Sequence, residues 1–367
     1  MQNNLSSQLP SSNAVRPDLL AQSFKSTTTS YKFLLLSALV RGVEDGKLSH
    51  DLPDLALEML VQAWWPVLHY RLTFGAADQV EVVLLEWAQE EPSLRRTSTE
   101  EVRRFLRRKG HVRQLDSLVR YVPQRLIRPW FREEVKGLPD HKVDATIAVL
   151  SCDQFDRTIP LYRVLGRQLE LHPEWAAYIR ENIAIVKGWL EFRWIEFLER
   201  RNPNVPGLAQ KLTAPSQRRS LNNQRKIWSH VLTKVDLRCI YSDRALSPHS
   251  FALDHFVPRS FVGHDRFWNL TPTYTEINSA KSDQLPPVSS IEPLFDQHRR
   301  VLEVMCEHHG ALKSVWRKIG EEYQIDLRLS EAVKAGNGEV EDAFKTTHGA
   351  LLGIAGRMWY PVMREIE

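Results

Sequence analysis

Residues 251–270 constrain the possible fold of this chain more than any other stretch. Two short apolar runs there stand on either side of a segment that begins with an aspartate and a histidine. The run Phe251-Ala252-Leu253 leads directly into Asp254 and His255, and Phe267-Trp268-Asn269-Leu270 follows after a loop. Short runs rich in aromatic and aliphatic residues favour β-strands. We therefore expect two strands joined by a loop, with Asp254 and His255 at the end of the first strand.

A short helix is expected directly after the second strand. Thr273-Tyr274-Thr275-Glu276 has the spacing of a capping box, which predicts that the helix begins there. Asn278 and Lys281 are three residues apart and so share one face of that helix. The order strand, loop, strand, helix predicts a small ββα unit. His264-Asp265 falls in the loop, where contact with a substrate and a plain polar loop tip are both open interpretations.

The spacing of these residues resembles that of HNH (ββα-metal) endonucleases. Asp254-His255 is followed by two hydrophobic residues and Pro258, and Asn269 comes fourteen residues after the histidine, with Asn278 nine further on and Lys281 three beyond that. The HNH domain of the CRISPR RNA-guided DNA endonucleases looks similar over Asp254–Phe261 and Asn278–Asp283, and Cys239-Ile240-Tyr241-Ser242 resembles the sequence that precedes it. The resemblance covers roughly fifty residues.

The resemblance implies a set of roles for these side chains. His255 would be the general base, since an imidazole suits proton transfer near neutral pH. Asp254 and Asn278 would bind one divalent cation, and their oxygen donors favour Mg2+ with Mn2+ as a substitute. Asn269 would fix the loop that orients His255, and Lys281 would contact a phosphate. Taken singly, each residue could equally be structural.

Cysteine usage argues against zinc. The three cysteines Cys152, Cys239 and Cys306 form no CxxC pair, so we expect no structural zinc and no disulfide framework. Cys306 lies near His308 and His309, but adjacent histidines on a helix diverge, which makes a metal site there an unfavourable interpretation. A reducing, cytoplasmic setting is predicted.

Outside the ββα unit the sequence predicts a mainly α fold. The segment from Trp175 to Leu198 has apolar residues at helical spacing, which predicts one long amphipathic helix. Other helices are expected at about 31–44, 54–72, 78–90, 99–109, 142–150, 291–309, 311–322 and 339–358, with a turn at Ala335–Gly338. The expected organisation is a flexible segment 1–30, a helical domain 31–200, a linker 201–225, the HNH module 226–290 and a helical C-terminal region 291–367.

Positive charge is concentrated between Arg95 and Lys136, where thirteen lysines and arginines face five acids. Such an excess could neutralise phosphates or form a solvated helix face. We expect Arg107 and Arg108 in this stretch, and Arg259 in the HNH module, to contact nucleic acid. The mixture Tyr121–Arg132 could stack bases, or it could be a core segment with Trp130 and Phe131 buried and its arginines in water.

Several function classes are excluded by what the sequence lacks. It has no GxxxxGK[ST] phosphate loop and no GxSxG elbow, which argues against an ATPase and a serine hydrolase. The apolar run Phe33–Val40 is too short to span a bilayer, and no export signal precedes it, so no membrane partner is expected.

The first function hypothesis is therefore an HNH endonuclease that nicks double-stranded DNA with one metal ion. The helical region ahead of the module, including Arg201–Pro206, looks like the layout of HNH proteins of bacterial antiphage defence, such as the nuclease component of Zorya-type systems, whose other components would be partners. Two alternatives are kept: a DNA-binding or partner-docking protein with an inactive or autoinhibited HNH fold, and a toxin-like RNase.

Overall fold

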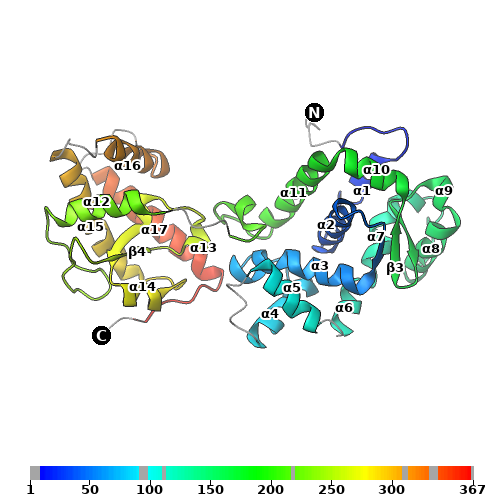
Figure 1. Ribbon diagram of the computed structural model, residues 1–367, viewed down its shortest axis with the longest axis horizontal. Coiled ribbons are helices and arrows are strands. Elements are labelled where there is room, and N and C mark those ends of the chain that lie inside the picture. The colour runs from blue at the N-terminus through cyan, green and yellow to red at the C-terminus, as the bar shows by residue number, and fades with distance from the viewer. Residues whose placement is uncertain are drawn as a thin grey trace. The chain divides into compact units, whose positions relative to one another are not determined.

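A computed structural model describes residues 9–90, 98–109, 113–215, 220–307, 313–329 and 338–364 (Figure 1). Helices account for 62% of the described residues and strands for 8%, which confirms the predicted mainly α class. The chain forms two compact units, Met1–Pro203 with Leu208–Ala214, and Asn204–Gly207 with Pro215–Glu367. No helix within the described ranges is both long and apolar enough to cross a membrane.

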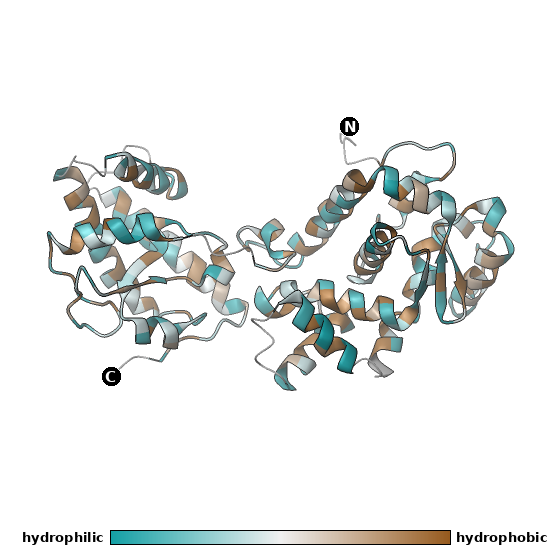
Figure 2. Ribbon diagram, in the orientation of Figure 1, coloured by the Kyte–Doolittle hydropathy of each residue, from teal (hydrophilic) through white to brown (hydrophobic). Residues whose placement is uncertain are grey.

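The first unit is a helical assembly with a small sheet. Its helices are α1 Pro17–Gln22, α2 Tyr31–Glu44, α3 Leu52–Trp64, α4 Gln79–Glu90, α5 Thr99–Lys109, α6 Arg113–Leu118, α7 Val122–Ile127, α8 Asp140–Asp153, α9 Phe155–Thr158, α10 Pro173–Glu181 and α11 Ile183–Glu199. A π-helical turn η1 spans Trp65–His69, and 3-10 turns η3 and η4 span Arg128–Phe131 and Leu208–Lys211. Helix α2 is largely apolar and buried, whereas α5 is largely polar (Figure 2).

The single helix expected at 175–198 is interrupted, which corrects that prediction. Helix α10 ends at Glu181 and α11 begins at Ile183, because Asn182 has φ −112° and ψ 24°. The Asn182 side-chain Nδ2 donates to the Tyr178 carbonyl at 2.9 Å. An asparagine that satisfies the preceding turn in this way competes with helical hydrogen bonding and favours a break.

A three-stranded sheet inside the helical region was not expected. Strand β3 (Gln168–Leu171) lies between β1 (Ser49–Asp51) and β2 (Tyr162–Leu165), and both pairings are antiparallel. These strands are three or four residues long, and such short runs give too little alternation to be recognised by period.

The described part of the segment expected to be flexible, residues 9–30, is packed against this unit. Leu20 in α1 is fully buried, and the Ser23 hydroxyl donates to the Leu126 carbonyl at 2.6 Å. The apolar side chains Leu9, Val15 and Leu20 supply the burial that holds this segment in place, and the Ser- and Thr-rich composition around them concealed it.

The second unit combines a two-stranded hairpin with helices from both sides of the sequence. Its elements are α12 Asn222–Leu232, β4 Ala252–His255, α13 Arg259–Val262, η5 Phe267–Asn269, β5 Leu270–Thr273, α14 Thr275–Lys281, η6 Val288–Ser290, α15 Ile291–Glu307, α16 Lys313–Asp326 and α17 Gly338–Arg357. The hairpin pairs β4 with β5 in antiparallel register, from Ala252 opposite Thr273 to His255 opposite Leu270.

The ββα order is as expected, but two of its boundaries differ. Residues 267–269 form the 3-10 turn η5, so that the second strand begins only at Leu270. The helix N-cap is Tyr274 without a side-chain cap bond, so the capping box is wrong. Thr273 belongs to β5 instead, and its Oγ1 lies 3.1 Å from Cys239 Sγ in the core.

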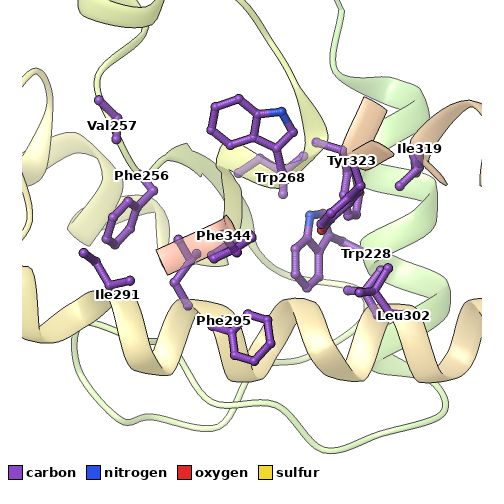
Figure 3. Packing of buried hydrophobic residues seen from close by; sticks show 14 of the residues in the cluster. Trp228, Phe256, Val257, Trp268, Ile291, Phe295, Leu302, Ile319, Tyr323 and Phe344 are labelled. Atoms are coloured by element: carbon purple, nitrogen blue, oxygen red, sulfur yellow. The ribbon is translucent and has the colours of Figure 1, made fainter. Parts of the chain in front are cut away.

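One hydrophobic core joins the hairpin to the C-terminal helices. Trp228 of α12, Phe256 after β4, Phe295 of α15 and Phe344 of α17 all belong to it (Figure 3). Trp228 stacks on Phe267 with 5.3 Å between ring centroids. The region 291–367, expected as a separate helical part, is therefore structurally continuous with the hairpin through the residues that the structure describes. His308, His309 and most of the Ala335–Gly338 turn lie outside the described residues.

Candidate active site

The site begins at the end of β4, where the strand delivers Asp254 and His255 next to each other. Alternation along a strand points their side chains in opposite directions. Asp254 faces the protein interior and is 3% exposed, whereas the His255 side chain retains 17% exposure. The strand therefore separates the pair into a buried carboxylate and a partly accessible imidazole.

Asp254 is held by the buried Lys281 and by the half-buried Tyr241. Lys281 Nζ lies 3.0 Å from Asp254 Oδ2 and 3.2 Å from Oδ1, and the Tyr241 hydroxyl donates to Oδ2 at 2.7 Å. Lys281 also donates to the His255 carbonyl at 2.7 Å, which ties α14 to the end of β4. Burial, followed by the negative charge of Asp254, raises the pKa of Tyr241 well above its ordinary value, so the phenol is a neutral donor to this carboxylate.

Lys281, which the family resemblance assigns to a phosphate, lies inside the protein. Its side chain is fully buried, so the ammonium does not reach a surface where a phosphate of a nucleic-acid backbone could bind. A buried charge requires a partner of opposite charge, and Asp254 supplies it. In this structure Lys281 therefore contacts Asp254 and the His255 carbonyl.

His255 is oriented by a carboxylate from the loop. Its Nε2 lies 2.9 Å from Asp265 Oδ1, and the same oxygen accepts from Arg259 Nε at 2.8 Å. The bond to His255, and then the pairing with Arg259, hold the pKa of Asp265 at about 2 against the opposing effect of burial. Arg259, expected to contact nucleic acid, uses its Nε for this bond, and its side chain is 21% exposed.

Asp265 was not singled out from the sequence as a functional residue. The sequence places it in a polar loop, and a separation of ten residues from His255 shows nothing about contact. The available signal was an acid in the same loop as Arg259, within reach of both Arg259 and His255. The fold of that loop brings the three side chains together.

Asn269 bonds to the backbone of the loop that follows His255. It is completely buried, its Oδ1 accepts from the Val257 amide at 2.9 Å, and its Nδ2 donates to the Val257 carbonyl at 2.9 Å. Its own carbonyl accepts from the Phe256 amide at 2.9 Å. These three bonds hold the backbone immediately after His255 in one conformation.

The remaining residues that the sequence predicts to bind metal or nucleic acid are Asn278 and two arginines of α5. Asn278 is half-buried on α14, one turn ahead of Lys281, and its backbone amide bonds to Tyr274 within that helix. Arg107 and Arg108 are exposed on α5, which belongs to the other unit. The residues expected to carry the chemistry, Asp254, His255, Asn269, Asn278 and Lys281, therefore all lie in the second unit.

The oxygen ligands at the site are of the kind that a hard divalent cation prefers, but they are few. Asp254 offers carboxylate oxygens and Asn278 an amide oxygen, which are ligands that Mg2+ accepts. No group of three or more His, Cys, Asp or Glu side chains that could hold a metal occurs among the described residues. A cation at Asp254 would have to share that carboxylate with Lys281.

Comparison with known proteins identifies the segment that carries this site. No curated protein and no solved structure matches the chain. Residues 239–287, which include Tyr241, Asp254, His255, Asp265 and Lys281, match the family model described as HNH endonuclease. The segment that forms the candidate active site is thus similar to HNH endonucleases, as its residue spacing predicted.

Proposed function

We propose that this chain is a metal-dependent HNH endonuclease that hydrolyses DNA phosphodiester bonds and nicks one strand at each active site. The observation that carries the proposal is His255, which has one ring nitrogen bonded to Asp265 and lies beside the buried carboxylate of Asp254. The matched family supports a nucleic-acid substrate. Double-stranded DNA is the form that we infer, and RNA is the alternative.

The arrangement around His255 suits proton abstraction from water. If Nε2 carries the ring proton and donates it to Asp265, the neutral imidazole presents Nδ1 as its acceptor. Nδ1 is then the atom that would take a proton from an attacking water. Asp265 holds the ring in that tautomer, and the bonds of Asn269 hold the backbone next to the ring.

Asp254 and Asn278 are the residues that would bind a divalent cation. Such an ion, when bound, neutralises the charge that develops on the phosphate and on the leaving oxygen. Lys281 and Tyr241 hold the Asp254 carboxylate at its position in β4, and Lys281 partly balances its charge.

A plasmid assay tests this function. Supercoiled DNA incubated with the full chain and Mg2+ is expected to yield nicked circles, and EDTA is expected to prevent the product. Single-stranded RNA in parallel reactions distinguishes the RNase alternative. Absence of nicking with Mg2+ or Mn2+ would favour the docking-protein alternative with an inactive fold. A role in antiphage defence stays a prediction, which the neighbouring genes would test.

Asp265→Asn is expected to lower the rate constant for nicking by about 10- to 100-fold with little change in KM, as for other residues that orient a functional histidine. The substitution keeps the side-chain size but removes the negative charge that pairs with His255 and Arg259. Single-turnover kinetics measure both parameters. Asp243→Asn is a matched control, because Asp243 is exposed in the same unit and forms its ion pair with Arg238, which is not a residue of the candidate site. An unchanged rate for Asp265→Asn would remove Asp265 from the mechanism.

A further inference from the structure

A second cluster of positive and aromatic side chains lies in the first unit, around the start of α7. Tyr121 is 46% exposed and directly precedes α7. The guanidinium carbons of Arg120 and Arg125 lie 5.2 and 5.1 Å from its ring centroid. Arg128 follows at the end of the helix and is exposed. We call Arg120, Tyr121, Arg125, Arg128 and the nearby Lys32 the α7 patch.

The sequence left two interpretations of Tyr121–Arg132 open, and the structure divides the segment between them. Trp130 and Phe131 are buried, with 6% and 0% exposure, so neither can stack on a ligand. Tyr121 and the arginines face outward. Within this segment Tyr121 is thus the aromatic ring available at the surface.

The positive charges of the α7 patch lie near one another. Lys32 Nζ donates to the Ser23 carbonyl at 2.8 Å. The pKa of Lys32 is lowered first by burial and then by the charges of Arg125 and Arg128, so the three cations repel one another. Like charges gathered in this way favour binding of an anion that relieves the repulsion.

Acidic residues neutralise little of the positive charge of the α7 patch. Arg125 Nε lies 3.5 Å from Asp144 Oδ2, which is a long contact for an ion pair. Across the described residues, no acidic side chain lies within ion-pair distance of Arg120 or Arg128, in contrast to Arg163 with Glu170 or Lys187 with Glu44 in the same unit. The patch therefore keeps a net positive charge at the surface.

We propose that the α7 patch binds single-stranded nucleic acid, with phosphates at the arginines and a base stacked on the Tyr121–arginine platform. Alternation of cationic and aromatic groups is what an unpaired strand requires, because each nucleotide presents one charge and one flat face. A duplex hides its base faces within the stack, so Tyr121 could engage only an unpaired base. The proposal goes beyond the cleavage chemistry, and it takes from the proposed function only the class of ligand.

Fluorescence anisotropy with the full chain in EDTA tests binding without cleavage. The probes are a labelled oligothymidylate, its RNA counterpart and a DNA duplex of the same length. Wild type is expected to bind both single strands more tightly than the duplex. Tyr121→Ala and Arg128→Ala are each expected to weaken single-strand binding about tenfold, and Arg128→Ala to reduce the salt slope by about one. Both side chains are exposed, so unchanged melting temperatures are expected.

Lys187→Ala is the matched control for loss of one positive charge. Lys187 is exposed and pairs with Glu44 at the C-terminal end of α2, whereas Lys32 is near the N-terminal end of that helix. Wild-type affinity in both α7 variants, or equal losses in the Lys187 control, would overturn the proposal. The proposal would also be overturned if the wild type bound the duplex more tightly than the single strands and Tyr121→Ala kept that preference. If the wild-type chain binds oligothymidylate but does not nick plasmid DNA, the proposed function is contradicted and the proposal for the α7 patch is not.

Discussion

His255→Ala is expected to reduce plasmid nicking by about 10²- to 10⁴-fold, which is the range that a positioned general base contributes. The ring is 17% exposed and therefore mostly buried, so its removal should cost about 1 kcal/mol of stability, the typical effect of a point substitution. Asp265 keeps Arg259 as a partner in the variant. The loss should therefore be a loss of chemistry, with melting temperature and DNA affinity close to those of the wild type.

His249→Ala is the matched control for this variant. His249 is an exposed histidine of the second unit and lies in a turn, where its backbone amide donates to the Ser247 hydroxyl. It contacts neither Asp254 nor His255 through any hydrogen bond or ion pair between described residues. Nicking by the control should equal that of the wild type. Undiminished nicking by His255→Ala would show that another group takes the proton, or that the activity comes from a contaminant.

Lys281→Met is expected to destabilise the second unit by about 3–5 kcal/mol in EDTA, the usual cost of removing one partner from a buried ion pair. The substitution keeps much of the side-chain volume but leaves the Asp254 carboxylate, which is 3% exposed, without its cation. It also leaves the His255 carbonyl without a donor. Urea denaturation monitored by tryptophan fluorescence measures the difference, because Trp228 and Trp268 are buried in the core of this unit.

Two further variants separate charge from packing at Lys281. Lys226→Met removes an exposed lysine of the same unit and should leave the free energy of unfolding unchanged. Asp254→Asn combined with Lys281→Met removes both charges, and it should recover part of the stability that the single variant loses. If Lys281→Met were as stable as wild type, the ion pair would not be holding β4 and α14 together.

Lys281→Met, which is expected to lower stability, is expected to raise the affinity of the site for a divalent cation. Lys281 Nζ, 3.0 Å from Asp254, competes with any cation for that carboxylate. Lys281→Met should therefore bind Mn2+ more tightly, as measured by the loss of the free-ion electron paramagnetic resonance signal. Added Mg2+ should also restore part of the lost stability. Weaker Mn2+ binding would mean that Lys281 helps to assemble the metal site.

Local patterns predicted much of the architecture. The helices α2 at Tyr31–Glu44 and α5 at Thr99–Lys109 have the bounds that their periodicity indicated, since helical spacing of apolar residues is a property of neighbouring positions. The order of the hairpin and α14 followed from the same kind of signal. The break at Asn182 was missed because it depends on one side-chain bond inside an otherwise regular pattern.

The sequence by itself determined the mainly α class and the ββα order, and it predicts Asp254 and His255 as the chemically active pair, because residue type and spacing are local information. Tertiary structure decided how these residues divide their roles. Tyr241 and Lys281 meet at Asp254 across separations of 13 and 27 residues, and Asp265 reaches His255 only through the fold of a loop. Lys281, which the sequence pattern assigned to a phosphate, is buried and forms an ion pair with Asp254, since a charge removed from water must be paired within the protein.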